Sequence, residues 1–312
     1  MSNIKRADEP CCGGYEYLVD DSGDVKAVQR STGEVVETVW MLVPLGSKVY
    51  TPESLNSRNE YLQQQKNNDL RKALNKELGK FFFIYHNEDF RDLSPQTVTR
   101  LIYLNTFIDF DNNKLMLTKH TPMKRKDLAN VLGVSKAVVS KFWSEVCPKY
   151  IREQDDGLIF TNTEIFIKRK LNHNGGYVPY EKFYINGIRA LYKATDISNH
   201  KHLGYVFKML PYINLEYNVL CKNPLEQNLD NIEFMSLAEF CNIIGYDVSQ
   251  LSRLLKIYKS LTFEVKTKRE RFCAFVYDGL DRGSARIFVN PHIFYNGSNY
   301  DQVKVLGKFC AE

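Results

Sequence analysis

The chain has 312 residues, of which 44% are hydrophobic and 25% are charged, and its formal net charge at pH 7 is +5. This composition is typical of a globular protein with two or three domains, and the mild positive charge permits a polyanionic partner without requiring one. It argues against a membrane-spanning protein, because the longest apolar run, Phe81–Tyr85, is far shorter than the roughly 20 residues that a bilayer requires.

The cysteines favour a reducing compartment. There are seven of them, an odd number without a C-x-x-C pair. Cys11 and Cys12 are adjacent, which suits no ordinary disulfide, and no histidine cluster lies near them, so we expect no metal site there. The sequence also has no basic start followed by an apolar stretch, so we expect a cytoplasmic protein.

The N-terminal part is predicted to be rich in strands. Residues 1–14 are polar and are expected to be irregular. Between Tyr15 and Tyr50, the segments YEYLV, VKAVQR, EVVETVWMLVPL and KVY alternate with turn-forming residues. This pattern predicts a small antiparallel sheet within an N-terminal β region, residues 1–50. The sheet is expected to pack on the next domain, although self-association or binding of another protein would use the same elements.

A long polar helix is predicted next, in a connector of residues 51–92. Thr51 and Pro52 open it, and its basic and amide side chains are expected to face solvent. The alternative is a connector that lies along a phosphate backbone. The sparse apolar stripe of this helix consists of Leu55, Leu62, Leu70, Leu74 and Leu78.

Residues 93–172 predict a winged helix-turn-helix domain. Gly133 lies at a tight turn between two short helices, where a positive φ costs glycine nothing, and Ser135 is a natural N-cap for the second helix. The strands Tyr150–Glu153 and Leu158–Thr161 flank an Asp-Gly turn and form the predicted wing. The apolar positions that such a helix pair requires are Leu128, Ala129, Leu132, Val134, Val139 and Phe142.

The same pattern recurs about one hundred residues later and predicts a second winged-helix domain, residues 177–297, before a C-terminal tail, 298–312. FIDFDNNKLML (Phe107–Leu117) parallels YINLEYNVLCK (Tyr212–Lys222), and LIFTNTEIF (Leu158–Phe166) parallels RIFVNPHIF (Arg286–Phe294). Three matching segments in the same order imply an internal duplication. The helix positions of the second copy are Phe240, Cys241, Ile244, Gly245, Tyr246, Leu251 and Leu254, with Ser236 as a candidate N-cap. Its longer wing is expected from about Phe263 to Val289.

The fold class is therefore α+β, mainly α, with two tandem winged-helix domains, a small N-terminal β region and a connecting helix. The second helix of such a domain can enter the major groove, where each base pair shows a distinct pattern of donors and acceptors. Lys, Arg, Gln and Ala are side chains that read base edges. The predicted base-reading residues are Lys136, Ala137, Ser140, Lys141, Ser249, Gln250, Ser252 and Arg253, with Lys136, Lys141 and Arg253 as the main candidates.

Basic residues flank both helix pairs and predict contacts to phosphates, which supply salt-dependent affinity. Asp247 and Glu239 dilute this charge in the second copy. If a pseudo-twofold axis or a simple translation relates the copies, one chain covers two successive major grooves of a long, asymmetric site. The predicted phosphate contacts are Lys119, Lys124, Arg125, Lys126, Lys168, Arg169, Lys256, Lys266, Lys268, Arg269 and Arg271.

The tandem duplication, the basic second helices and the segment IFVNPHIFYNG (Ile287–Gly297) resemble plasmid and phage replication initiators, especially those with two winged-helix domains. The resemblance covers roughly Ser94 to Gly297. Similar proteins occur in phages and mobile elements of low-GC Gram-positive bacteria. The resemblance implies binding to repeated sites in double-stranded DNA at an origin, regulation of the protein's own promoter and recruitment of host replication proteins in the bacterial cytoplasm. A homodimer is compatible with it.

Two other classes of non-enzymatic protein fit the same sequence. A transcriptional regulator of a phage or mobile element would use identical DNA contacts and would work with host transcription proteins. An adaptor would act on a host factor through the N-terminal β region, with the winged helices as its scaffold. The genomic position of the bound site separates the first from an initiator, and weak, non-selective DNA binding would favour the second.

An enzyme is the alternative of a different kind. The chain has no Walker loop, G-x-G-x-x-G, G-x-S-x-G or H-E-x-x-H motif. His200 and His202 invite comparison with the paired histidines of rolling-circle nickases, but the residue between them is Lys201, where that motif places a bulky apolar residue. We therefore expect a solvent-facing histidine pair, with no catalytic residue, no cofactor and no metal.

Overall fold

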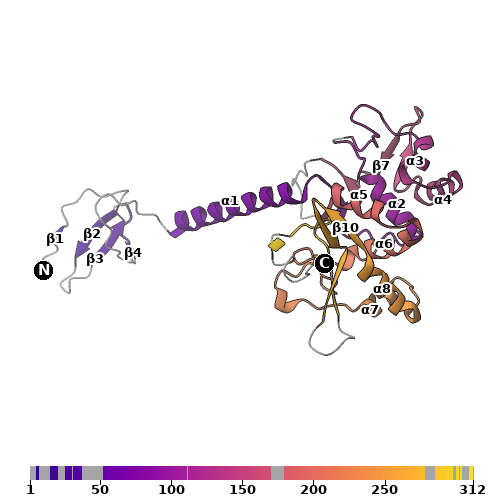
Figure 1. Ribbon diagram of the computed structural model, residues 1–312. Helices are drawn as coiled ribbons and strands as arrows, with labels where there is room; N and C mark the ends of the chain where they lie inside the picture. Colours follow the sequence, from indigo (N-terminus) through magenta and orange to yellow (C-terminus); the bar gives the residue numbers. More distant parts are fainter. Residues whose placement is uncertain are drawn as a thin grey trace. The chain divides into compact units, whose positions relative to one another are not determined.

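The computed structural model describes residues 5–6, 15–19, 25–29, 31–36, 52–110, 112–169, 179–277, 285–297, 300–301, 303 and 309–311 (Figure 1). The chain divides into two compact units, Met1–Gln63 and Gln64–Glu312. The larger unit contains both copies of the duplicated segment, so the expected boundary near residues 172–177 falls inside it. Cys11, Cys12, residues 172–177 between the two predicted domains and the strand-like segment 37–50 lie outside the described residues.

The smaller unit contains an antiparallel sheet with the strand order β1-β2-β3-β4. The strands are β1 (Lys5–Arg6), β2 (Tyr15–Val19), β3 (Val25–Gln29) and β4 (Val35–Val36). The predicted small sheet is therefore present. The expectation that residues 1–14 are irregular is wrong at β1, which pairs with the end of β2. A strand of two residues is too short to leave an alternating pattern in the sequence.

The expected polar helix is α1 (Pro52–Leu78), which contributes to both units. Leu74 and Leu78 expose only 7% and 3% of their surface, whereas Leu62 and Leu70 each expose 49%. Gly79 ends the helix with a φ of 92°, a value that favours glycine. Of the stripe residues whose burial the structure describes, only Leu74 and Leu78, in the last two turns of the helix, are therefore packed.

At the centre of the larger unit lies an antiparallel sheet with the order β8-β5-β9. Its strands are β5 (Phe81–Tyr85), β8 (Phe166–Ile167) and β9 (Tyr180–Tyr184). Strand β9 runs directly into α5 (Ile185–Ala194). The partner of β9 is β5, about one hundred residues away, so local sequence carries little sign of the pairing.

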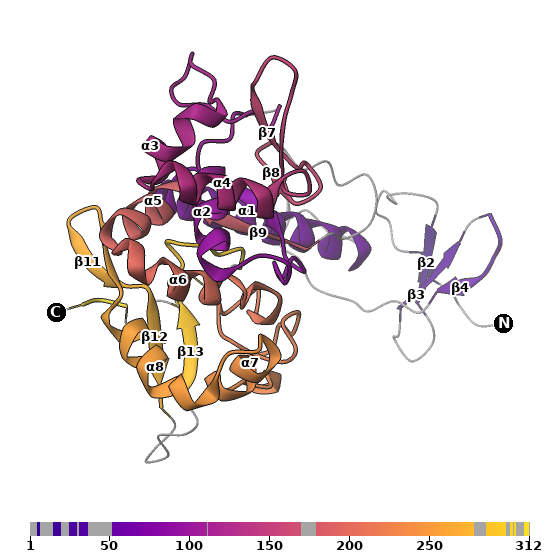
Figure 2. The ribbon, with the colours of Figure 1, turned by 90° about the vertical axis from the view of Figure 1, so that its right-hand side faces the viewer.

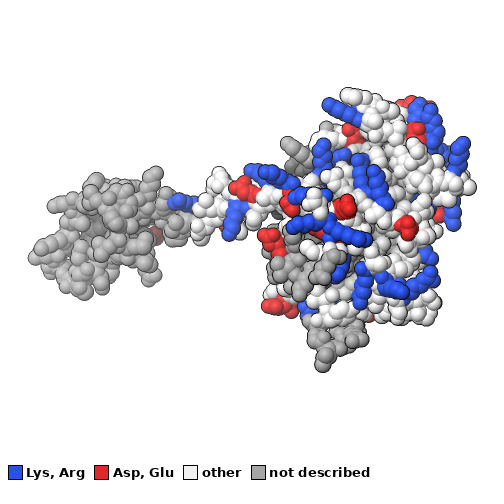
Figure 3. All heavy atoms as spheres, in the orientation of Figure 1, with Lys and Arg blue, Asp and Glu red and all other residues white. Residues whose placement is uncertain are grey.

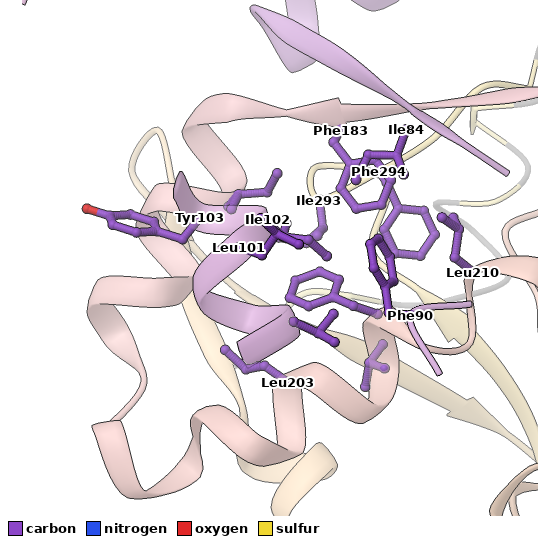
Figure 4. Close-up of a cluster of buried hydrophobic side chains, with 14 of the residues drawn as sticks. Ile84, Phe90, Leu101, Ile102, Tyr103, Phe183, Leu203, Leu210, Ile293 and Phe294 are labelled. Carbon is purple, nitrogen blue, oxygen red and sulfur yellow. The ribbon is translucent and has the colours of Figure 1, made fainter. Parts of the chain in front are cut away.

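The inner face of this sheet packs on helices α2 (Pro95–Asn105) and α6 (His200–Phe207). These two helices also pack extensively against each other. Figure 4 shows Ile84 and Phe183 from the sheet above Leu101 and Ile102 of α2, and Leu203 of α6 is also in the cluster. The two copies of the duplication therefore share one hydrophobic core.

Matching backbone hydrogen bonds support the duplication. They occur at corresponding positions of both copies. The pairs are Leu115 N to Ile159 O (2.9 Å) with Leu220 N to Ile287 O (2.9 Å), Val134 N to Ala129 O (3.0 Å) with Tyr246 N to Cys241 O (2.8 Å), and Asn162 N to Tyr150 O (2.9 Å) with Asn290 N to Phe272 O (2.9 Å).

A buried asparagine plays the same part in each copy. Asn113 and Asn218 have left-handed backbones, with φ of 55° and 56°. The Nδ2 of Asn113 donates to the carbonyl oxygen of Phe166, and that of Asn218 donates to Phe294 at 2.9 Å. Each asparagine thus ties the start of its copy to the last segment of that copy, which explains why these distant segments recur together in the sequence.

An approximate twofold axis, not a translation, relates the two copies. The N–H groups of Tyr85 and Tyr184 donate to corresponding carbonyls, at 3.0 and 2.8 Å, which makes Phe83 the counterpart of Lys182. Phe83 and Lys182 also pair with each other at the centre of the β5–β9 ladder. Residues that pair with their own counterparts lie on a twofold axis, so the axis passes through this pair.

The same twofold axis relates helices α2 and α6. The hydroxyl of Thr99 donates to the carbonyl oxygen of His200 at 2.7 Å. Gly204, the counterpart of Thr99, lies against Pro95, the counterpart of His200, so closely that an added Cβ would be 1.7 Å from the Pro95 carbonyl oxygen. The same contact is therefore made twice, once in each direction.

The symmetry fails at one buried position of the sheet. Glu181 is fully buried where its counterpart is Phe82, and His86, also fully buried, lies 3.8 Å from it. Burial raises the pKa of Glu181 well above its ordinary value and lowers that of His86 to about 4. Burial therefore favours the neutral form of each group, which avoids the larger cost of two buried charges.

Candidate nucleic-acid interface

The first helix pair follows the prediction closely. Helix α3 (Leu128–Leu132) ends at Gly133, whose φ is 64°, and α4 (Lys136–Val146) begins after Ser135. The Ser135 hydroxyl accepts the N–H of Val138 at 3.4 Å, so Ser135 is the expected N-cap. Strands β6 (Ile151–Glu153) and β7 (Ile159–Thr161) form the expected hairpin.

Helix α4 buries one face and exposes the other. Val139, Phe142, Trp143 and Val146 point into the core. The spacing of these residues leaves the four predicted base-reading positions on the outside, as the sequence indicates. Lys136, Ala137, Ser140 and Lys141 are all exposed.

A basic edge lies at the start of the first helix pair. Lys119, Lys124 and Lys126 are exposed, as expected for phosphate contacts. The guanidinium of Arg125 lies 4.8 Å from the ring centroid of Trp143, a cation–π contact that sequence reasoning missed. This contact fixes Arg125 beside α4, because the ring belongs to that helix.

The second helix pair has the same plan with different caps. Ser236 and Glu239 form a capping box at the start of α7 (Leu237–Ile243), so Ser236 is the expected N-cap. Gly245 occupies the turn with a φ of 67°. Helix α8 (Leu251–Ser260) follows a short 3-10 turn, Val248–Gln250. All the second-copy base-reading candidates, Ser249, Gln250, Ser252 and Arg253, are exposed, as is Lys256.

The second copy departs from the first at the start of its outer helix. Val248 occupies the position of Lys136 and is 38% exposed. Nearby, a hydrogen bond from Lys222 lowers the pKa of Glu239 to about 2, and the two charges form a 2.8 Å ion pair. The second helix pair is therefore less positive than the first, as the sequence indicates. Val248 is not among the predicted base-reading residues, which are all polar or small.

Two of the lysines that are predicted to contact phosphates also contact other residues of the protein. Lys168 is half-buried, its Nζ donates to the carbonyl oxygen of Ile108, and burial lowers its pKa. Lys266 forms a 2.8 Å ion pair with Glu77 of α1. The ammonium group of Lys168 is therefore already hydrogen-bonded within the protein, the charge of Lys266 is already paired, and the phosphate contacts of both stay predictions.

The expected second wing, Phe263–Val289, is two separate hairpins. Strands β10 (Thr262–Val265) and β11 (Lys268–Arg271) form an insertion, whereas β12 (Cys273–Val276) and β13 (Arg286–Val289) pair as β6 and β7 do. The basic cluster therefore belongs to the insertion and not to the wing. The exposed members of the cluster are Lys266, Lys268, Arg269 and Arg271, and Arg169 is exposed on the first copy.

Helices α4 and α8 lie on one side of the larger unit, the side that faces the viewer in Figure 2. In Figure 3, Lys and Arg side chains gather over the α3–α4 region and again over the α8 region. The twofold axis explains this placement, because it carries α4 approximately onto α8. Helices α4 and α8 are therefore accessible from the same side of the larger unit.

The histidine pair of α6 does not face solvent, so this expectation is wrong. His200 and His202 expose only 1% and 4% of their surface, and burial lowers both pKa values. The Nε2 atom of His200 is hydrogen-bonded to the carbonyl oxygen of Thr195 at 3.1 Å, and the imidazole ring packs against the ring of Tyr192. Among the described residues, no group of three or more His, Cys, Asp or Glu side chains is arranged to hold a metal.

Comparison of the chain with models of protein families, with curated proteins and with solved structures gives no match. Within the described part of the chain, no helix combines the length and apolar character needed to span a membrane. The helix pairs with their exposed outer helices are thus the features on which a function can be argued.

Proposed function

We propose that the protein binds double-stranded DNA sequence-specifically through two winged-helix domains, with α4 and α8 as recognition helices. The observation that carries this proposal is that both helices expose their predicted base-reading residues on one side of one compact unit. A helix of this kind fits the major groove, and its exposed polar side chains then reach base edges.

The twofold axis supports a specific mode of binding. Duplex DNA has local twofold symmetry, so two recognition helices related by such an axis meet equivalent groove surfaces about one helical turn apart. They read their half-sites in opposite directions. Because Lys136 of the first helix corresponds to Val248 of the second, the half-sites differ in sequence, and the full site is asymmetric.

The exposed side chains have separate roles in this proposal. Lys136, Lys141 and Arg253 read bases, since Lys and Arg pair with the guanine edge. Lys119, Lys124 and Lys126 contact phosphates, and Arg125 does so from a position fixed by Trp143. Each phosphate contact makes the slope of log affinity against log salt concentration more negative by about 0.9.

We further propose that the bound site lies in a replication origin. This follows from the resemblance to initiators with two winged-helix domains, and a regulator would use the same helices. The position of the site decides between the two functions. Iterated copies in an origin support initiation, whereas a single copy over a promoter supports regulation.

Selection of duplexes from a random pool by the full-length protein tests the proposal. We expect an enriched motif with two different half-sites about one helical turn apart. Lys136→Ala should relax preference in one half-site and Arg253→Ala in the other, while Lys76→Ala, which changes an exposed lysine of α1, should leave the motif unchanged. A pool without any enriched motif would contradict the proposal and favour the adaptor.

A further inference from the structure

A tyrosine of the second copy packs against the turn of the first helix pair. Tyr192 of α5 is buried, and its hydroxyl donates to the carbonyl oxygen of Leu132, at the end of α3, at 2.9 Å. Its ring stacks on Tyr103 of α2, with ring centroids 3.8 Å apart and an angle of 8° between the planes. The phenol of Tyr192 therefore fills the space between α2 and the end of α3.

The corresponding place in the second copy is a cavity of about 290 Å³. Four of the residues that line it are counterparts of residues at or beside the Tyr192 site. The pairs are Lys208 with Tyr103, Tyr212 with Phe107, Ile244 with Leu132 and Gly245 with Gly133. The twofold axis therefore carries the site that Tyr192 fills onto a cavity. Its volume is close to the lower limit of roughly 300 Å³ for small-molecule sites.

The chain provides no ring for this cavity because the connecting segment is shorter. Residues 185–199 join β9 to α6 and include α5, whereas residues 86–94, all of them described, join β5 to α2 without a helix. The ring of Phe90 in this segment packs instead on Tyr150 and Phe166, with centroids 5.8 and 6.4 Å away. Asp89 and Arg91, which form an ion pair with each other, line the cavity in place of a ring.

The groups around the cavity suit an aromatic ring with a hydroxyl donor. The carbonyl oxygen of Ile244 corresponds to the one of Leu132 that accepts the Tyr192 hydroxyl. Lys208 replaces the stacking ring of Tyr103, and a cation also attracts the face of an aromatic ring. The ammonium of Lys208 is held in place, because it donates to the carbonyl oxygen of Leu93 at 2.7 Å.

We propose that this cavity, between α6 and the turn of the second helix pair, binds a small phenol. Its ring lies beside Lys208, and its hydroxyl donates to the carbonyl oxygen of Ile244 as that of Tyr192 does to Leu132. The bound phenol then completes the packing of the second helix pair, as Tyr192 completes that of the first. Phenol binding does not require the proposed binding of DNA.

The test is an NMR titration of the full-length protein, labelled on its isoleucine methyl groups, with 4-methylphenol. This probe is the side chain of tyrosine without its backbone. We expect saturable shifts for the methyl groups of Ile243 and Ile244, because both residues line the cavity. The variants Ile243→Val and Ile244→Val assign the two resonances. Toluene, which lacks only the hydroxyl, should bind about fivefold more weakly, because one hydrogen bond is lost.

A substitution at the open side of the cavity provides a second measurement. Ile243 is 46% exposed, so Ile243→Trp adds an indole there without entering the core. We expect it to weaken 4-methylphenol binding by roughly tenfold or more, because the indole takes the space of the ligand. The matched control is Leu225→Trp, since Leu225 is 58% exposed and lies outside the cavity lining. It should bind as the wild type does.

Four results would overturn the proposal. They are the absence of saturable shifts at Ile243 and Ile244, equal affinity for toluene, unchanged affinity in Ile243→Trp, and an equal loss in both tryptophan variants. Tighter binding of a Gly-Tyr-Gly peptide than of 4-methylphenol would assign the cavity to a tyrosine of a partner protein instead. The titration contains no DNA, so its outcome is separate from that of duplex selection.

Discussion

Substitution of Gly204 by alanine tests the packing that holds the two copies together. The added Cβ would be 1.7 Å from the Pro95 carbonyl oxygen and 2.3 Å from the carbonyl carbon, whereas real Cβ contacts under 3.0 Å essentially never occur. Helices α2 and α6 must therefore separate by at least about 1.3 Å at this point. Because both neighbours are backbone atoms, no rotamer change relieves the contact.

The expected loss in the free energy of unfolding is about 2 kcal/mol, because a contact with backbone atoms places the overpacking cost near the upper end of its range. Overpacking of this kind costs about 1–3 kcal/mol or more, while the better helix propensity of alanine returns up to about 1 kcal/mol. Thermal unfolding followed by circular dichroism measures the change, with Lys201→Ala, at an exposed position of the same helix, as the control. A Gly204→Ala protein within about 0.5 kcal/mol of the wild type would refute the close α2–α6 contact.

Three further variants test separate parts of the structure. Asn218→Ala removes two buried hydrogen bonds, at 2.8 and 2.9 Å, from a left-handed residue, so we expect a loss of about 2–4 kcal/mol in thermal unfolding. Glu181→Gln removes a buried carboxyl whose raised pKa makes the native state bind a proton that the unfolded state loses above about pH 4.5. The wild type should therefore lose stability relative to this variant as the pH rises above about 4.5, and a constant difference in Tm would contradict the burial of the neutral acid. Trp143→Leu releases Arg125 from its cation–π contact and should weaken duplex binding roughly two- to fivefold, but it should cause no additional loss in a protein that already carries Arg125→Ala.

The sequence predicts the helix pairs well because their signals are local. Glycine at a left-handed turn, a serine cap and apolar residues at helical spacing lie within about twenty residues, and Gly133, Ser135 and Ser236 take the expected places. Matching spacing also identifies the duplication. The exposed positions of α4 follow from the same spacing, because burial of one helix face leaves the other outside.

Features that depend on distant partners could not be predicted. Tyr180–Tyr184 becomes a strand only because β5 pairs with it, and His200 and His202 are buried because α6 packs on α2. In the sequence, Lys168 looks like a free cation in a basic run, but its ammonium group donates a hydrogen bond to the carbonyl oxygen of Ile108. The twofold axis could not be predicted from the sequence either. Two copies that are related by a translation have the same spacing along the chain as two copies that are related by a twofold axis.

The measurement that tests the central claim most directly is the affinity of the Lys136→Ala and Arg253→Ala variants for the duplex selected by the wild type. We expect each variant to lose about 1–3 kcal/mol of binding free energy, and to lose discrimination only in the half-site that its own helix reads. Wild-type affinity and unchanged base preference in both variants would show that α4 and α8 do not enter the major groove.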